Sequence, residues 1–236
     1  MSADDAAPDA TRSDATTWRE LAVARSLDPA RVRAEKRVQR FLDAALELIN
    51  SERGRDFTVQ EVVERSGQSL RSFYQYFTGK HELLLALFED AVRSTSEHLQ
   101  KVVAKEEAGL PRLHLCVVEY YKLCRPGPKG KSPETVAALR AMGEFAQQLL
   151  TEHPKEAAKA FVPLVTLFDQ VLDEAAEAGA IRPDLSNSRL AGVVLQAVMF
   201  NAFATTISST LIRSEDAGTD AEELWDLLIN GIGQRS

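Results

Sequence analysis

The chain has 236 residues, of which 44% are hydrophobic, enough for an ordinary globular core and unlike a disordered chain. Its two cysteines, Cys116 and Cys124, cannot form a disulfide framework, and eight positions apart on one helix they would lie ~12 Å apart, too far for a bridge. The first 18 residues are polar and acidic and lack the apolar segment of a signal peptide. We therefore expect a cytoplasmic protein with reduced thiols.

The net charge of −7 is unevenly distributed along the chain. Between Arg25 and Phe41, only Asp28 and Glu35 oppose a group of cations. This pattern predicts a local positive potential near the N-terminus and an acidic body beyond residue 80. The cations of this segment are Arg25, Arg31, Arg33, Lys36, Arg37 and Arg40.

In chain order, the hydrophobic periodicity is helical nearly throughout. Residues 1–27 are expected to be a mostly disordered extension with a possible short helix over 18–26, and Asp28-Pro29 then opens a helix that Gly54 ends. Thr58-Val-Gln-Glu61 has the form of a capping box and opens a short helix that closes at Ser66. Gly67 suits a left-handed C-terminal position, and Ser69 can cap the next short helix. Further helices are expected over 80–105, 111–124, 133–152, 155–178, 187–211 and 221–230.

The stretch from Leu190 to Ile212 carries no charge and is long enough to span a bilayer. It contains several polar side chains, however, and lacks flanking aromatic residues. Burial on two sides, against the core and against a partner, explains it better.

The two short helices around Gly67 cannot each bury a core, but together on a preceding amphipathic helix they form a helix-turn-helix unit. A helical wheel places Leu70, Phe73 and Phe77 on one side, where they should pack on Phe41, Leu48, Val62 and Val63. Arg71, Ser72, Tyr74 and Gln75 spread around the opposite side, and such groups bind phosphates and base edges. From this polar face alone, a solvated helical hairpin remains an equal alternative.

The pattern Thr58-x-x-x-Val62-Val63-x-x-Ser66-Gly67-x-Ser69-x-x-Ser72-Phe73-Tyr74-x-Tyr76-Phe77-x-x-Lys80-x-x-Leu83-Leu84 resembles the DNA-binding signature of TetR-type transcriptional regulators. The resemblance covers about residues 33 to 88. The chain departs from it at Gln68, where the family usually has a small apolar residue, and at Leu70, where many members are polar or small.

The resemblance implies roles for individual residues. Tyr74 and Lys80 match phosphate-binding positions, Arg71, Ser72 and Gln75 match positions near base edges, and Thr58 lies at a helix N-terminus that favours a phosphate. Because it is cationic, the basic segment from Arg25 to Arg40 is expected to raise DNA affinity without choosing sequence; a merely solvated helix face is the alternative. The expected DNA-binding residues are Arg31, Arg33, Thr58, Ser69, Arg71, Ser72, Tyr74, Gln75 and Lys80.

The resemblance further implies an all-α protein in which a three-helix DNA-binding domain over 28–80 precedes a helical effector-binding and dimerisation domain over 81–236. A homodimer would bind double-stranded operator DNA, act most simply as a repressor, and be released by a small, largely apolar molecule. The expected dimer interface contains Ala191, Val194, Leu195, Val198, Leu224, Leu227 and Leu228. Candidate pocket residues are Tyr120, Met142, Phe145, Phe168, Gln196 and Asn201, with ordinary core packing as the alternative for the apolar ones and the dimer interface as the alternative for the two amides.

No residue pattern points to catalysis, a cofactor or a metal. "GPKGKS" at 127–132 lacks the first glycine of a phosphate-binding loop and follows a helix. The four histidines, His81, His98, His114 and His153, form neither His-x-x-x-His nor Glu-x-x-His pairs. We therefore expect no enzyme activity; the alternatives are an all-helical enzyme or an interaction module with a vestigial DNA-binding fold.

Overall fold

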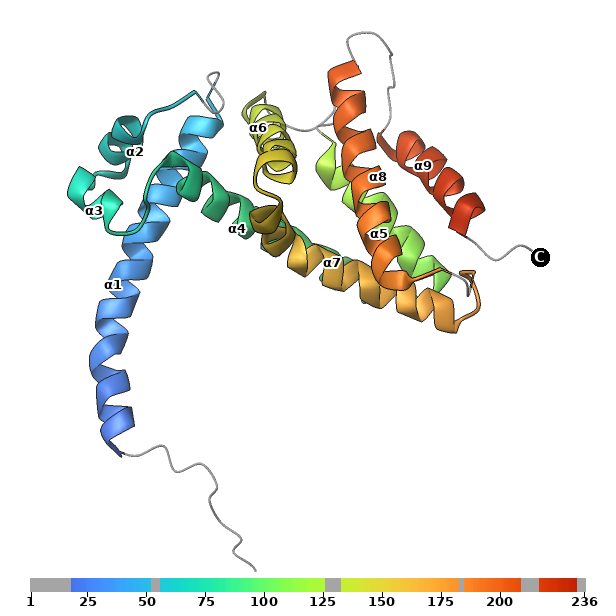
Figure 1. Cartoon of the computed structure of the whole chain (residues 1–236), viewed down its shortest axis with the longest axis horizontal. Helices are drawn as coiled ribbons and strands as arrows, with labels where there is room; N and C mark the ends of the chain where they lie inside the picture. Colours follow the sequence, from blue (N-terminus) through green and yellow to red (C-terminus); the bar gives the residue numbers. More distant parts are fainter. Residues whose placement is uncertain (1–17, 52–55, 126–132, 183–184, 209–216, 233–236) are drawn as a thin grey trace, which may run out of the picture. The chain divides into compact units, whose positions relative to one another are not determined.

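The structure, a computed structural model, describes residues 18–51, 56–125, 133–182, 185–208 and 217–232. Within these ranges it contains nine α-helices and no β-strand (Figure 1), which confirms the all-α class. The helices are α1 (Trp18–Ile49), α2 (Val59–Ser66), α3 (Leu70–Tyr74), α4 (Lys80–Val103), α5 (Leu110–Cys124), α6 (Pro133–Glu152), α7 (Pro154–Glu177), α8 (Asn187–Ser208) and α9 (Ala217–Ile232).

Helix α1 differs from the expectation of two helices separated at Asp28-Pro29, because it continues through Pro29 as one element. Proline in a helix interior removes the hydrogen bond that its own N–H would donate to residue 25. The flanking residues are rich in alanine, arginine and glutamate, which are strong helix formers and outweigh that single loss.

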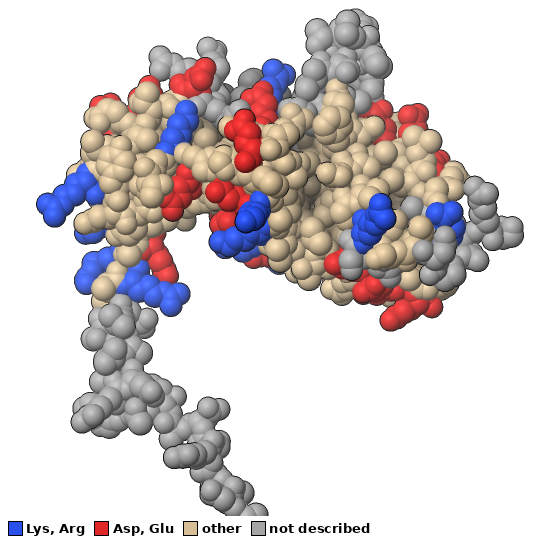
Figure 2. Space-filling model, viewed as in Figure 1, with Lys and Arg blue, Asp and Glu red and all other residues tan. Residues whose placement is uncertain are grey.

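The internal contacts divide the chain into two units, Met1–Arg40 and Phe41–Ser236. In the first unit, the described side chains are largely exposed and basic, and Figure 2 shows Lys and Arg gathered along α1. Arg31 Nε donates to Glu35 Oε1 over 2.8 Å, one turn apart on the surface. The boundary expected at residue 80 falls inside the second unit, at the first residue of α4, and stays a prediction.

An aromatic cluster forms the core beneath α2 and α3. The Phe41 ring lies 5.4 Å from that of Phe73 and 6.2 Å from that of Phe77, both edge to face, and Phe73 is fully buried. These contacts confirm the expected packing of Phe73 and Phe77 on Phe41. Leu70 was expected in the same core but is 42% exposed. The helical wheel fails there because α3 ends at Tyr74, so that Phe77 reaches the core from the turn and not from the helix face of Leu70.

The caps of α2 and α3 follow the sequence pattern. The Thr58 hydroxyl accepts from the Glu61 N–H over 3.2 Å and Glu61 Oε2 accepts from the Thr58 N–H over 2.7 Å, which closes the expected capping box. Gly67 ends α2 with φ of +64°, and Ser69 Oγ accepts from the Ser72 N–H over 3.1 Å. The turn between the two helices is therefore set by one glycine and two side-chain caps.

Helices α4 to α9 form the remaining bundle. Helix α7 packs against α4, α5, α6 and α8, and α5 packs in addition against α8 and α9. Among the ion pairs that cross this bundle, Arg112 Nη1 lies 2.7 Å from Glu174 Oε2 between α5 and α7, and the buried Arg125, just after α5, pairs with Asp220 of α9. Among the described helices, α8 included, none has the length and hydrophobicity needed to cross a membrane.

Replacing Gly67 with alanine tests whether the left-handed turn limits the stability of this unit. Nothing lies within 4 Å of the added Cβ, so the cost comes from the backbone alone. We expect a loss of about 1–2 kcal/mol, because an L-residue is disfavoured in this conformation. The matched control is Gly79→Ala, whose φ of 176° is extended backbone with the same empty surroundings. Thermal unfolding followed by circular dichroism should show a clear decrease for the first variant only; equal decreases would contradict the assignment.

Candidate nucleic-acid interface and effector cavity

The outer face of α3 presents three polar side chains to solvent. Arg71 and Gln75 are exposed, and Tyr74 is 57% exposed although its ring packs edge to face against Phe73 at 5.5 Å. This packing leaves the Tyr74 hydroxyl at the end of a supported ring. A guanidinium, an amide and a phenol on one short helix can donate to phosphates and bind base edges.

Ser69 and Ser72 are placed differently from these three residues. Ser69 Oγ already accepts from the Ser72 N–H as the N-cap of α3. Ser72 Oγ is buried and forms no hydrogen bond with the part of the chain that is described. The Ser72 hydroxyl is therefore not exposed on the outer face of α3, and its expected contact with a base edge stays a prediction.

Thr58 lies at the N-terminus of α2, but its donors are already used. Both its N–H and its hydroxyl lie within hydrogen-bonding distance of Glu61 Oε2, at 2.7 and 3.0 Å. The negative charge of Glu61 therefore occupies the place that was expected for a phosphate. Binding a phosphate at Thr58 would require Glu61 to move.

Lys80 is the first residue of α4 and connects it to the segment before α2. Its Nζ donates to the Phe57 carbonyl over 2.6 Å and lies 4.4 Å from the centre of the Phe57 ring. An ammonium group can donate three hydrogen bonds. Lys80 thus has a structural contact that the sequence did not predict. The other expected cations, Arg31 and Arg33, lie in the first unit, where both are exposed.

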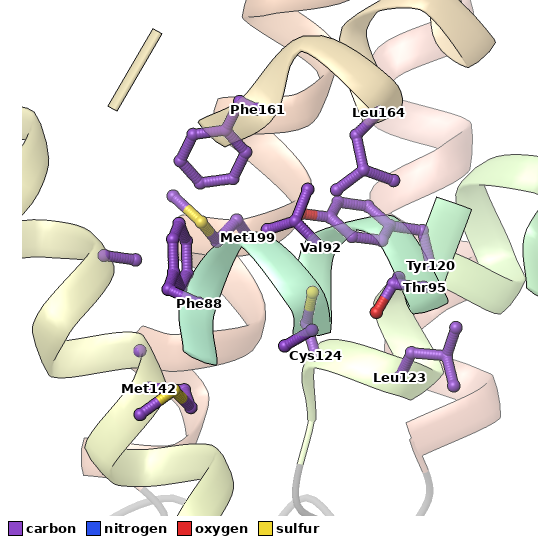
Figure 3. A pocket seen from close by; sticks show the side chains of 13 residues that line it. Phe88, Val92, Thr95, Tyr120, Leu123, Cys124, Met142, Phe161, Leu164 and Met199 are labelled. Atoms are coloured by element: carbon purple, nitrogen blue, oxygen red, sulfur yellow. The ribbon is translucent and has the colours of Figure 1, made fainter. Parts of the chain in front are cut away.

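Two cavities lie among α4, α5, α6, α7 and α8. One has a volume of about 160 Å³ and an almost wholly apolar wall (Figure 3). The other has a volume of about 640 Å³ and is lined mainly by α7 and α8. Tyr120, Phe161 and Met199 line both cavities and so form a common wall.

The pocket residues expected from sequence divide into three groups. Tyr120 and Met142 line the smaller cavity, and Tyr120 and Gln196 line the larger one. Phe145 and Phe168 are core residues that line neither, in agreement with the core alternative. Asn201 also lines neither, and its Oδ1 accepts from the Tyr121 hydroxyl over 3.2 Å.

Most of the cavity wall was missed from the sequence. Its members are ordinary apolar residues on four helices, and nothing in their spacing separates them from core residues until the helices are packed. Arg189 of α8, exposed at the larger cavity, carries a charge and could have been singled out as the residue that opens the uncharged stretch. The main residues missed were Phe88, Val92, Thr95, Leu123, Cys124, Phe161, Leu164, Arg189, Val193 and Met199.

The polar groups near the common wall are kept neutral by burial. Burial, with a smaller contribution from Cys124, raises the pKa of Tyr120 well above its usual value. Burial also raises the pKa of the Cys116 thiol to about 12, so that this thiol is unreactive at neutral pH. The common wall of the two cavities thus offers apolar surface and the neutral hydroxyl of Tyr120.

The residues expected at a dimer interface lie mostly inside the protomer. Ala191, Val194, Leu195, Val198 and Leu224 are buried by their own chain, so they have little surface left for a partner to cover. The four residues of α8 among them lie on the side of that helix that packs on α5 and α7, whereas Leu224 belongs to α9, which packs on α5. Leu227 is 74% exposed, and Leu228 is half-buried. Exposed apolar residues that the sequence analysis did not select are Val193 and Phe200 of α8.

Residues 41–87 match the family model "Bacterial regulatory proteins, tetR family". The fatty acid metabolism regulator protein of Bacillus subtilis (strain 168) is 21% identical over 194 residues, which cover 81% of this chain and 93% of that protein. The solved structure of FadR from Bacillus subtilis in complex with stearoyl-CoA has a TM-score of 0.63 at 16% identity, and covers 82% of this chain and 98% of that one. Thermus thermophilus FadR in complex with lauroyl-CoA has a TM-score of 0.63 at 21% identity, with 84% and 96% covered.

The matched segment contains the aromatic cluster, both capped short helices and the first residues of α4, and the solved structures extend the likeness in fold to the helices around the cavities. Residues 41–87 are thus a DNA-binding domain of the kind found in bacterial regulatory proteins of the tetR family, and the chain is a ligand-responsive, DNA-binding transcriptional regulator.

Proposed function

We propose that this regulator senses a long-chain acyl thioester such as an acyl-CoA, and that the bound acyl chain releases it from its operator. The observation that carries the proposal is the pair of cavities with a common wall of Tyr120, Phe161 and Met199. The complexes of the two FadR proteins with stearoyl-CoA and lauroyl-CoA support the same ligand class.

The smaller cavity suits the end of an acyl chain. Phe88, Val92, Leu164 and Met142 surround it, and the Tyr120 ring closes one side (Figure 3). Each methylene group buried against such a wall contributes about 0.8 kcal/mol. A polar ligand would leave its hydrogen-bonding groups without partners there.

The larger cavity suits the polar end of the ligand. In its wall, Arg189 and Gln196 of α8 are exposed beside apolar residues of α7 such as Val162 and Val165. The arginine fork binds phosphate oxygens well, and a CoA group carries several. The ligand would thus lie with its chain inward and its phosphates near Arg189.

Helix α4 provides the route from the cavity to DNA. Phe88, Ala91 and Val92 of this helix line the smaller cavity, while Lys80 at its start bonds the Phe57 carbonyl just before α2. A ligand that separates the cavity walls would therefore displace α4 and, with it, α3, the helix that is proposed to contact DNA. Release follows if the ligand binds the displaced arrangement more tightly.

For the DNA contact, we propose that Arg71 and Gln75 bind base edges and that Tyr74 and Lys80 bind phosphates. The exposure of Arg71, Tyr74 and Gln75 supports these roles. Arg31 and Arg33 remain proposed as sequence-independent contacts because they lie on an exposed, basic helix segment.

For the dimer, we propose an interface built on α8 and α9 around Val193, Phe200 and Leu227. These side chains are 50%, 62% and 74% exposed in the protomer, and large exposed apolar side chains favour burial against a partner. Phe200 lies seven residues after Val193, two turns along the same helix face.

The effector proposal predicts that operator release depends on chain length. Fluorescence anisotropy of a labelled operator duplex should show release by long-chain acyl-CoA and none by free CoA. Two added methylenes should improve the half-effective concentration by roughly tenfold, since about 1.6 kcal/mol of burial is gained, until the cavity is full.

A variant at the common wall supplies the control for this experiment. Met199→Trp should narrow both cavities and shift the half-effective concentration of long-chain acyl-CoA upward, while Gln170→Trp, an exposed residue of α7 outside both cavities, should not. Equal responses to free CoA and long-chain acyl-CoA would eliminate the acyl chain as the recognised group.

The DNA proposal separates base contacts from phosphate contacts. Arg71→Ala should cost about 1–3 kcal/mol on the operator and relax the preference at one base pair. Lys80→Ala should weaken binding to operator and random duplex alike, flatten the salt dependence by about one unit, and lower the unfolding temperature because the Phe57 contact is lost. Lys101→Ala, an exposed lysine of α4, serves as the control. If Arg71→Ala lowered the affinity for the operator and for random duplex by the same factor, Arg71 would be a phosphate contact and not a base contact.

The dimer proposal is tested by Phe200→Glu and Leu227→Glu. Each would bury an unpaired charge at the interface, at a cost of several kcal/mol, so sedimentation velocity should show folded monomers. Val32→Glu changes a 45% exposed apolar residue of α1 and should leave the dimer intact. Dimers of unchanged affinity in both α8 and α9 variants would place the interface elsewhere.

A further inference from the structure

Three side chains that the proposed function does not use lie together where α4 and α7 begin. His81 is the second residue of α4, His153 is the N-cap of α7, and Glu156 is in the first turn of α7. His81 Nε2 lies 2.7 Å from Glu156 Oε2, and His153 Nδ1 lies 3.8 Å from the same oxygen. One nitrogen or oxygen from each residue lies within 4.8 Å of the others. We propose that these residues bind Zn²⁺ and thereby tie the start of α4 to the start of α7.

The donor set fits the chemistry of zinc. Two imidazole nitrogens and one carboxylate oxygen leave a fourth tetrahedral position for water. With bonds of about 2.0–2.2 Å, the ligand atoms of a tetrahedral site lie ~3.3 Å apart. The separations between 2.7 and 4.8 Å bracket this value. The three side chains are each about 40% exposed, so small rotations can close the site.

An ion pair between His81 and Glu156 does not explain why a second imidazole ring, that of His153, lies beside the same carboxylate. The two imidazole rings lie 4.4 Å apart, centre to centre, beside a single carboxylate. Charging both rings would place two positive charges side by side at two helix N-termini, which already carry partial positive charge. Neutral imidazole is the form that binds a metal, and Glu156 supplies the negative charge that a cation requires at this position.

The chain contains an internal comparison for this site. His114 Nε2 lies 2.6 Å from Glu222 Oε2, as close as the His81–Glu156 pair. No second histidine completes that pair, and among the described residues only the His81 group brings three possible metal ligands together. His114 therefore serves as a matched control for a histidine paired with a glutamate.

The location gives the site a consequence for regulation, and this part rests on the proposed function. Pro154 and Ala157, on either side of Glu156 in the first turn of α7, line the larger cavity. His81 follows Lys80, which contacts the segment before α2. A metal bound here would oppose movement of α4 relative to the cavity wall, so more effector would be needed for release.

Binding is tested on the full chain after removal of metal with a chelator. Titration with Zn²⁺ against a fluorescent chelator should show one site per chain, and Mg²⁺, which prefers oxygen ligands, should not compete. His81→Ala and Glu156→Gln should each weaken Zn²⁺ binding by more than the roughly 10–100-fold that loss of an outer-shell partner costs. His114→Ala should bind as the unaltered chain does.

Thermal unfolding shows whether each variant is still folded. Without metal, the variants should unfold within a few degrees of the unaltered chain, and Zn²⁺ should raise the unfolding temperature only where the site is intact. Equal Zn²⁺ binding by the His81→Ala variant and the unaltered chain would overturn the site. These measurements need neither DNA nor acyl-CoA. Their result for the metal site therefore does not depend on whether the proposed function is correct. If Zn²⁺ binds but leaves the half-effective effector concentration unchanged, the regulatory consequence is wrong and the site stands.

Discussion

The contact between Phe73 and Phe41 is the constraint on which the DNA-binding part depends. A five-residue helix has too few internal hydrogen bonds to persist by itself, so α3 requires tertiary contacts. The buried Phe73 ring supplies them, with Phe77 and Phe41 arranged around it. Because the cluster fixes Phe73, it also fixes which side chains α3 presents outward. The orientation of Arg71 thus follows from the burial of Phe73, and Tyr74 is held in addition by the contact of its ring with Phe73.

Helix α4 links this aromatic cluster to the smaller cavity. It is a single helix whose first residue holds the Phe57 carbonyl and whose middle residues line the smaller cavity. Further along, Ser96 Oγ donates to the Pro163 carbonyl of α7 over 3.0 Å, which fixes the two helices against each other. A rigid element held at both ends transmits a displacement of the cavity wall with little loss. The His81, His153 and Glu156 group lies where α4 and α7 begin, so a metal there would stiffen the same connection.

Local patterns predicted the capped elements well. The Thr58 capping box, the left-handed Gly67 and the Ser69 cap depend on neighbouring residues, and the structure contains all three. The sequence did not predict contacts between residues that are far apart along the chain. Lys80 and Phe57 are 23 residues apart, so a lysine with the appearance of a phosphate ligand could not be recognised as a backbone contact.

In the candidate sites, too, the features that the sequence did not predict depend on residues brought together by the fold. The buried side of α8 could not be separated from its exposed side, because both sides are uncharged; Val198 is fully buried and Phe200 is 62% exposed two residues later. The histidine and glutamate group was missed since its members are up to 75 residues apart. Cavity residues such as Phe161 and Met199 have no chemical feature that distinguishes them from core residues.

We propose that an acyl chain in the cavity moves α3, the helix that contacts DNA, in both protomers through α4. The direct measurement is the distance between spin labels on the two protomers, attached at Gln60→Cys on the exposed face of α2 in a Cys124→Ser background, by double electron–electron resonance. Operator DNA should select one distance, which matches half-sites about 34 Å apart, and long-chain acyl-CoA should shift the distribution away from it. An unchanged distance distribution under conditions where acyl-CoA releases the operator would contradict a release mechanism in which the ligand displaces α3.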